Sequence, residues 1–144
     1  AMHPTPYLFF NGTCREALTF YADVFGAEIE MMSAFSELPP SEEVHVPEGK
    51  GDWIMHAAIQ WPDGGMLMAS DNVAEDQPRM EGNSISMALP TVDAGRAAFE
   101  RLAEGGKVGT PYGPMFWTPG FGTVRDRFGT RWMITTVAPF DAAS

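Results

Sequence analysis

The sequence is poor in cysteine and in basic residues, and each shortage excludes a class of protein. Its single cysteine, Cys14, excludes an internal disulfide framework and suits a reducing compartment, so we expect a cytoplasmic protein. Nine Lys and Arg stand against 19 Asp and Glu, and the net charge of −10 repels phosphate backbones and anionic membrane surfaces. No apolar run reaches the roughly 18 residues of a membrane-spanning helix. We therefore expect neither nucleic acid nor a membrane as a partner.

Histidine is also scarce, which argues against a three-histidine metal cluster. His3 is near the N-terminus, His45 lies in an acidic loop, and only His56 falls within an apolar segment. A metal site built from these residues would need three distant segments to converge. We expect no metal ion and no other cofactor.

A helical segment occurs twice in the chain. Residues 13–29, TCREALTFYADVFGAEI, correspond to residues 92–108, VDAGRAAFERLAEGGKV, at an offset of 79 that places Phe20 over Phe99. In each copy an amphipathic helix is predicted to end at glycine and to lead into a strand. A repeat of this length predicts two copies of one supersecondary unit.

The ends and the apolar faces of both helices can be predicted from the same segments. Thr13 and Glu16 have the spacing of a capping box at the start of the first helix. The second helix should begin near Asp93 and end at residues 105–106. The predicted apolar faces consist of Ala17, Phe20, Tyr21 and Val24 in the first helix and of Ala98, Phe99 and Leu102 in the second.

Strand signals surround both helices. In the first module we expect a buried strand at 7–10, strands at 29–32, 53–61 and 66–70, and a hairpin turn at 62–65, PDGG. Residues 33–52 read as an exposed loop with a short helical turn. In the second module we expect strands at 85–89, 122–125 and 130–136, while GTPYGPMFWTPGFG, residues 109–122, is typical of an ordered loop that displays aromatic side chains. The expected organisation is a first module at 3–71, a linker at 72–83 and a second module at 84–138, in one compact domain.

Particular residues in this arrangement resemble a known family. Pro6-Tyr7-Leu8 before Asn11-Gly12, Phe20-Tyr21, Val24-Phe25-Gly26, His56-Ala57, Ser70-Asp71, and Phe128-Gly129 with Trp132 resemble the vicinal oxygen chelate superfamily, which includes glyoxalase I, bleomycin-resistance proteins and extradiol dioxygenases. The resemblance is closest to its PhnB-like branch, often labelled 3-demethylubiquinone-9 3-methyltransferase. It implies an α+β fold of two βαβββ modules whose curled mixed sheets form a cup, commonly closed in a homodimer.

The resemblance also implies where the metal ligands of catalytic members would stand. Those positions fall at Pro6 or Tyr7, Met68 or Ala69, Ile85 or Ser86, and Met133. None supplies the imidazole, carboxylate or thiolate that Zn, Ni, Mn or Fe prefer, so we expect the family metal site to be absent. The methyltransferase label is not supported either, because no GxGxxG motif follows a strand as in a nucleotide-binding fold.

Several residues are candidates for contact with a ligand. His56 is the best candidate for an acid or base, although it also suits a hydrogen-bonded core position. Gln60 shares its face of the strand. Arg131 suits an anionic group and lies on the face of Met133, whereas Cys14 is either a thiol activated by the helix dipole or a small core side chain. The aromatic candidates for an apolar pocket are Tyr7, Phe9, Phe116, Trp117 and Phe121, which would also suit a plain core.

The sequence therefore favours a small-molecule-binding protein. It does not identify catalytic residues, and His56 is the best candidate for one. It would bind or sequester an apolar or aromatic ligand in a cup between modules, as a homodimer and without the family metal. One alternative is a metal-dependent lyase or dioxygenase of the same superfamily. A second alternative is a structural dimer with no ligand, in which the aromatic side chains fill the cup.

Overall fold

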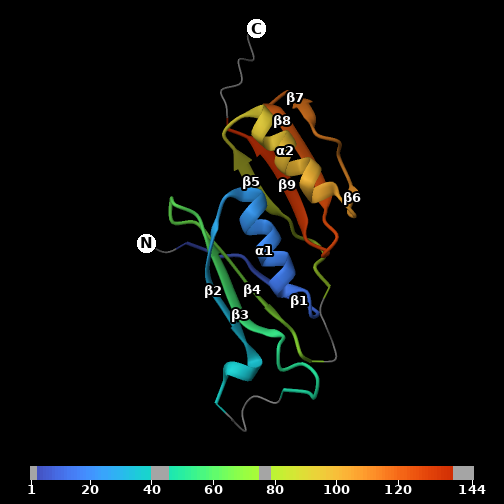
Figure 1. Ribbon diagram of the computed structural model, residues 1–144. Coiled ribbons are helices and arrows are strands. Elements are labelled where there is room, and N and C mark those ends of the chain that lie inside the picture. Colours follow the sequence, from blue (N-terminus) through green and yellow to red (C-terminus); the bar gives the residue numbers. More distant parts are fainter. Residues whose placement is uncertain (1–2, 40–45, 75–78, 138–144) are drawn as a thin grey trace. The chain divides into compact units, whose positions relative to one another are not determined.

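The computed structural model describes residues 3–39, 46–74 and 79–137 of the chain. The chain divides into two compact units, Ala1–Arg79 and Met80–Ser144. Each unit contains one mixed sheet and one long helix (Figure 1). This confirms the predicted α+β fold of two βαβββ modules, and neither sheet closes on itself. Within the described ranges, no helix is long and apolar enough to cross a membrane.

The first unit follows the order βαβββ. Its elements are β1 (Tyr7–Phe10), α1 (Cys14–Phe25), β2 (Glu28–Ala34), a short 3-10 turn η1 (Phe35–Glu37), β3 (Ile54–Gln60) and β4 (Met66–Asp71). The strand order is β1-β4-β3-β2, and only the β1–β4 pair is parallel. The turn η1 matches the helical turn predicted for the loop at 33–52. Residues 40–45 of that loop, which include His45, lie outside the described residues.

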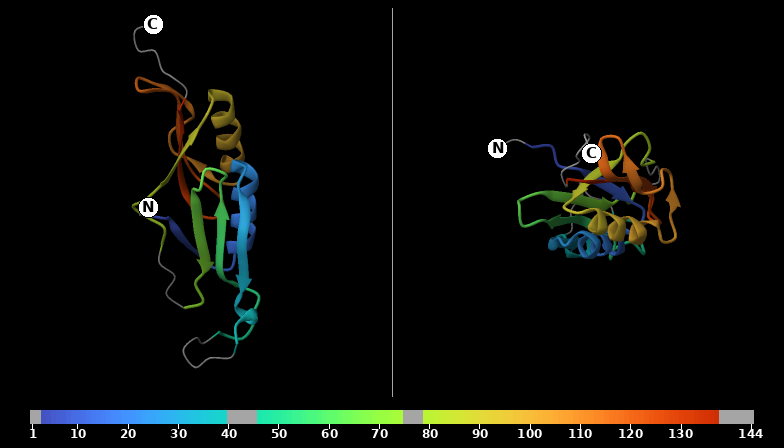
Figure 2. Two further views of the ribbon diagram at one scale, coloured as in Figure 1. Left: turned by 90° about the vertical axis from the view of Figure 1, so that its left-hand side faces the viewer. Right: turned by 90° about the horizontal axis from the view of Figure 1, so that it is seen from above.

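The helix α1 covers only one face of the first sheet, as Figure 2 shows. Along β1, Leu8 and Phe10 are 6% and 2% exposed, whereas Tyr7 and Phe9 are 39% and 43% exposed. The prediction of a wholly buried first strand is therefore wrong, because alternate side chains of a strand point to opposite faces. The helix contributes Cys14, Ala17, Leu18, Tyr21 and Ala22 to the core, whereas Phe20 and Val24 of the predicted face are only half-buried.

A buried carboxylate holds the start of α1. Thr13 stands at the helix N-cap but its side chain makes no capping hydrogen bond, so the predicted capping box is wrong. Instead, Asp71 Oδ1 accepts hydrogen bonds from the backbone N–H groups of Gly12 (2.8 Å) and Cys14 (3.0 Å). Its Oδ2 accepts a third from the N–H of Ile54 (2.8 Å). One side chain at the end of β4 thus fixes the helix start and the beginning of β3.

The second unit repeats the pattern with one added strand. Its elements are β5 (Ile85–Leu89), α2 (Val92–Ala103), β6 (Lys107–Val108), β7 (Gly113–Met115), β8 (Thr118–Arg125) and β9 (Arg131–Thr136). The strand order is β5-β9-β8-β6, with β7 also paired to β8 and only β5–β9 parallel. Residues 75–78 of the predicted linker and residue 138 of the predicted second module lie outside the described part of the chain.

The glycine-rich segment is a hairpin, which corrects the predicted loop at 109–122. Strands β7 and β8 pair through Met115 and Thr118, leaving Phe116 and Trp117 as a two-residue turn. Glycine and proline favour loops in general, but here Pro114 falls at a register irregularity of β7. Gly122 leaves room for the helix, since an added Cβ would lie 2.8 Å from the Phe99 ring and 2.9 Å from the Tyr112 backbone.

Candidate functional site

Each sheet has a helix-free face, opposite its own helix, and all nine predicted ligand-contact residues lie on these faces or on the hairpin turn. In the first sheet, Tyr7 is in register with Met68, which is in register with Ala58. Residues two apart share a face. On strands β1, β3 and β4, the helix-free face of the first sheet therefore includes Tyr7, Phe9, His56, Ala58, Gln60, Met66, Met68 and Ser70.

Three aromatic side chains gather on the first helix-free face. The Tyr7 ring lies with its centroid 5.6 Å from that of His56 in a stacked arrangement, and 5.1 Å from that of Phe9. Tyr7 Oη is 3.0 Å from His56 Nδ1, within hydrogen-bonding distance. Strand β4 separates β1 from β3, so the two side chains reach across it. The half-buried His56 thus has a defined orientation, and one ring nitrogen is engaged with Tyr7.

Three aromatic rings in the hairpin of the second unit contact one another in series. The Phe116 and Trp117 rings meet edge to face with centroids 4.8 Å apart, and Trp117 and Phe121 do so at 5.4 Å. Phe116 is 84% exposed and Trp117 50% exposed. Edge-to-face pairs of this kind hold aromatic rings in a fixed mutual arrangement. The turn therefore presents a preformed apolar surface.

The second helix-free face combines apolar and cationic side chains. Phe121 is in register with Thr135, Thr123 with Met133 and Arg125 with Arg131. Ser86 of β5 is in register with Met133. The opposite face holds Trp132 and Ile134, both fully buried. Phe121, Arg131 and Met133 therefore share one face, and the alternation of the last strand had indicated this for Arg131 and Met133.

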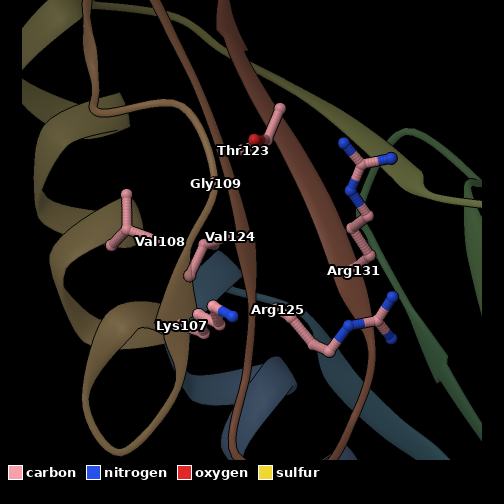
Figure 3. Close-up of a pocket in the computed structure, with 7 residues that line it drawn as sticks. All are labelled: Lys107, Val108, Gly109, Thr123, Val124, Arg125 and Arg131. Atoms are coloured by element: carbon pink, nitrogen blue, oxygen red, sulfur yellow. The ribbon is translucent and has the colours of Figure 1, made fainter.

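Two basic neighbours of Arg131 were not identified in the sequence. Lys107 is in register with Arg125, and both line a hollow of about 150 Å³ together with Arg131 and Thr123 (Figure 3). The pair Arg125 and Arg131 could have been inferred from the turn between β8 and β9. The pairing of Lys107 with Arg125 joins distant segments, which no local pattern indicates.

The Cys14 thiol is not activated. Its side chain is fully buried, and burial, reinforced by the negative charge of Asp71 and opposed by Arg15, raises the pKa of the thiol to about 12. The predicted effect of the helix dipole is outweighed by desolvation, which disfavours the thiolate. Cys14 is therefore a protonated core residue.

The positions implied for the family metal ligands are paired in the structure. Tyr7 lies beside Met68, and Ser86 beside Met133. Hydroxyl and thioether groups are not the ligands that Zn, Ni, Mn or Fe prefer. Among residues 3–39, 46–74 and 79–137, no three His, Cys, Asp or Glu side chains are grouped to hold a metal ion. The donor set at these positions does not fit the metal of the catalytic members.

Comparison with known proteins gives a consistent result over nearly the whole chain. Residues 4–134 match the model of the glyoxalase/bleomycin resistance protein/dioxygenase superfamily. Protein YjdN of Escherichia coli strain K12 is 32% identical over 139 residues, covering 92% of this chain and 94% of that protein.

Two solved structures extend the comparison to the fold. The crystal structure of PA1353 from Pseudomonas aeruginosa is 38% identical, with a TM-score of 0.86 over 96% of this chain and 100% of that one. A PhnB protein from Bacillus cereus, provisionally described as a 3-demethylubiquinone-9 3-methyltransferase, is 25% identical with a TM-score of 0.78, covering 94% of this chain and 100% of that one.

Proposed function

Because the chain belongs to the glyoxalase/bleomycin resistance protein/dioxygenase superfamily, we propose that it binds or sequesters a small apolar or aromatic molecule. The ligand lies against a helix-free face of a sheet, and no metal ion takes part. One observation carries the proposal: both units present partly exposed aromatic side chains on surfaces that no helix of their own unit covers. Aromatic surfaces of this kind suit flat or hydrophobic ligands.

The contacts on the first helix-free face favour a binding role for its aromatic residues. Tyr7 and Phe9 stay 39% and 43% exposed although their ring contacts and the hydrogen bond to His56 hold them in place. A side chain that is both oriented and accessible loses little conformational freedom when a ligand binds. His56 and Gln60 supply polar groups beside the apolar surface, which is the usual composition of a small-molecule site.

The donor set supports binding without a metal ion. Tyr7, Met68, Ser86 and Met133 at the implied ligand positions lack imidazole and carboxylate groups.

The fold of this chain does not support the methyltransferase description of the Bacillus cereus protein. The strands of this chain are joined mainly by hairpins and not by the crossovers of a nucleotide-binding fold. If the protein were instead a metal-dependent lyase or dioxygenase, each chain should hold about one tightly bound transition metal. Metal analysis that finds such a metal, lost in a His56→Ala variant, would contradict the proposal.

The proposal includes a homodimer in the cytoplasm. Paired modules from two chains are the arrangement implied by the superfamily, and the lone buried thiol of Cys14 suits a reducing compartment. Light scattering should give about twice the chain mass of 15.7 kDa. A mass of one chain at all accessible concentrations contradicts the dimer but leaves the binding role intact.

Native mass spectrometry of protein isolated from its source tests the binding role. We expect a bound organic molecule whose occupancy falls in Tyr7→Ala and Trp117→Ala variants. Phe20→Ala is the matched control, because Phe20 is a half-buried aromatic residue on α1 and not on a helix-free face. An unliganded protein that also binds no aromatic probe would favour the structural dimer.

A further inference from the structure

A row of three cations crosses the second sheet. Lys107 on β6 is in register with Arg125 on β8, which is in register with Arg131 on β9. Side chains directly opposite each other on neighbouring strands point to the same face. The row contains three of only nine Lys and Arg residues in a chain of net charge −10. Such a concentration of positive charge contrasts with the acidic character of the rest of the protein.

Within residues 3–39, 46–74 and 79–137, no carboxylate forms an ion pair with Lys107 or Arg131. Like charges opposite each other on neighbouring strands are destabilising. Neither Lys107 nor Arg131 forms an ion pair or a side-chain hydrogen bond with any residue in the described part of the chain. Arg125 is held in place instead, because its Nη1 donates to the backbone carbonyls of Gly129 (2.7 Å) and Met80 (3.0 Å). The row therefore has one fixed guanidinium flanked by two cations with unused donors.

The three cations line the same hollow, with a volume of about 150 Å³. Figure 3 shows the guanidinium groups of Arg125 and Arg131 extending to the same side, with Lys107 near Arg125. Val108, Gly109, Thr123 and Val124 complete the lining. The backbone N–H of Thr110 already bonds Thr123 Oγ1 (2.8 Å), and that of Gly109 bonds the Thr123 carbonyl (2.9 Å). These two backbone N–H groups are therefore already hydrogen-bonded within the protein. The donors left for a ligand are those of the cations.

We infer that this hollow binds an oxyanion, a carboxylate or phosphate group, of the ligand. The inference rests on the proposed function, because the row shares its face with Phe121 and Met133. Met133 is two residues from Arg131 and Phe121 four from Arg125, so an apolar body over these side chains would lie about 7–13 Å from the cations. The ligand class is therefore an amphiphilic anion. Guanidinium and ammonium groups bind such oxyanions through charge-assisted hydrogen bonds.

Two fluorescent probes with the same aromatic rings test the oxyanion site separately from the proposed binding of an aromatic ligand. 1-Anilinonaphthalene-8-sulfonate carries an oxyanion, and N-phenyl-1-naphthylamine is its uncharged counterpart. In a Lys107→Gln, Arg131→Gln double variant, we expect the anionic probe to bind at least about tenfold more weakly, since charge-assisted hydrogen bonds are lost. Binding of the neutral probe should be unchanged. Arg125→Gln is not used, because it would remove the hydrogen bonds to Met80 and Gly129.

Arg15→Glu is the matched control, because it lowers the net charge by two units, as the double variant does, at an exposed position of α1. If the neutral probe binds but the double variant and the control affect the anionic probe equally, the oxyanion site is overturned and the proposed function stands. If neither probe binds, the proposed function fails. The oxyanion site is then decided by amide NMR titration with inorganic phosphate and with benzoate, which also distinguishes the two groups. Saturable shifts at Lys107, Arg125 and Arg131 would support it, and their absence with both anions would overturn it.

Discussion

The Tyr7 hydroxyl lies 3.0 Å from Nδ1 of His56, and their rings are stacked. This contact joins β1 to β3 across the intervening strand β4. It holds a tyrosine ring at the surface in a defined orientation, although that ring is 39% exposed. Its ring and its hydroxyl can be removed separately, and the two changes have different expected consequences.

Tyr7→Phe should weaken binding of N-phenyl-1-naphthylamine by no more than a few-fold. It removes one partly exposed hydrogen bond, which contributes about 0.5–1.5 kcal/mol, and keeps the aromatic surface. Tyr7→Ala should weaken binding by about tenfold or more, because the buried area of a whole ring is lost. Fluorescence titration measures both. Equal affinities for Tyr7→Ala and the wild type would remove Tyr7 from the site.

Asp71→Ala should lower the free energy of unfolding by at least about 2 kcal/mol. Three backbone N–H groups lose their acceptor: the buried ones of Cys14 and Ile54 and the part-buried one of Gly12. Each buried unsatisfied donor costs about 1–3 kcal/mol. Urea unfolding measures the change. The control is Asp63→Ala, where an exposed carboxylate accepts one hydrogen bond, from the N–H of Gly65, and we expect it to cost less than about 1 kcal/mol. Similar losses for both variants would show that Asp71 does not organise the helix start.

Gly122→Ala should destabilise the second unit by about 1–3 kcal/mol, because the added methyl overpacks a filled core. Its Cβ would lie 2.8 Å from the Phe99 ring and 2.9 Å from the backbone of Tyr112. Gly113→Ala is the comparison, since nothing lies within 4 Å of its Cβ and its φ is not positive. We expect it to change stability by less than about 1 kcal/mol. A neutral Gly122→Ala in thermal unfolding would show that α2 packs less closely on β8.

Cys14 should resist thiol reagents in the native protein and react readily in denaturant, because its pKa is raised to about 12 and its side chain is fully buried. A raised pKa means that the folded state favours the protonated thiol. The resulting stability is present in full below the ordinary value of 9.0 and is lost as pH rises from there to about 12.

Unfolding measured across this range should show the wild type's advantage over Cys14→Ala shrinking as the solution becomes more alkaline. The packing lost in Cys14→Ala does not depend on pH. The stability difference between the wild type and the variant below pH 9.0 is therefore the reference for the difference at higher pH. A constant difference across the range, or rapid labelling of the native protein, would contradict a buried protonated thiol.

The two modules and most strands could be predicted from the sequence, because apolar runs and turn residues mark them locally. The packing of the helices could not. The buried positions Cys14, Ala17, Leu18 and Tyr21 correspond to Gly95, Ala98, Phe99 and Leu102 at an offset of 81, whereas the sequence match at 79 places Phe20 over Phe99. A helix rotated by part of a turn buries a different stripe, and this rotation is set by the sheet beneath it.

The candidate site shows the same division. Alternation along a strand was enough to place Arg131 and Met133 on one face. It was not applied to the first strand, which was predicted to be buried although Tyr7 and Phe9 are exposed. The Tyr7–His56 contact and the row from Lys107 to Arg131 depend on which strands are neighbours. Those pairings join residues far apart in the chain, and local patterns do not determine them.

The indole N–H signals of the four tryptophans provide the most direct test of ligand binding at the aromatic surface. Trp117 is 50% exposed beside Phe121, whereas the indole of Trp132 donates to Asp126 and that of Trp61 to the Phe25 carbonyl. In an NMR titration with N-phenyl-1-naphthylamine, the account predicts a saturable shift of the Trp117 signal while the Trp132 and Trp61 signals stay in place. A Trp117 signal that does not move, or a saturable shift confined to the other tryptophans, would contradict it.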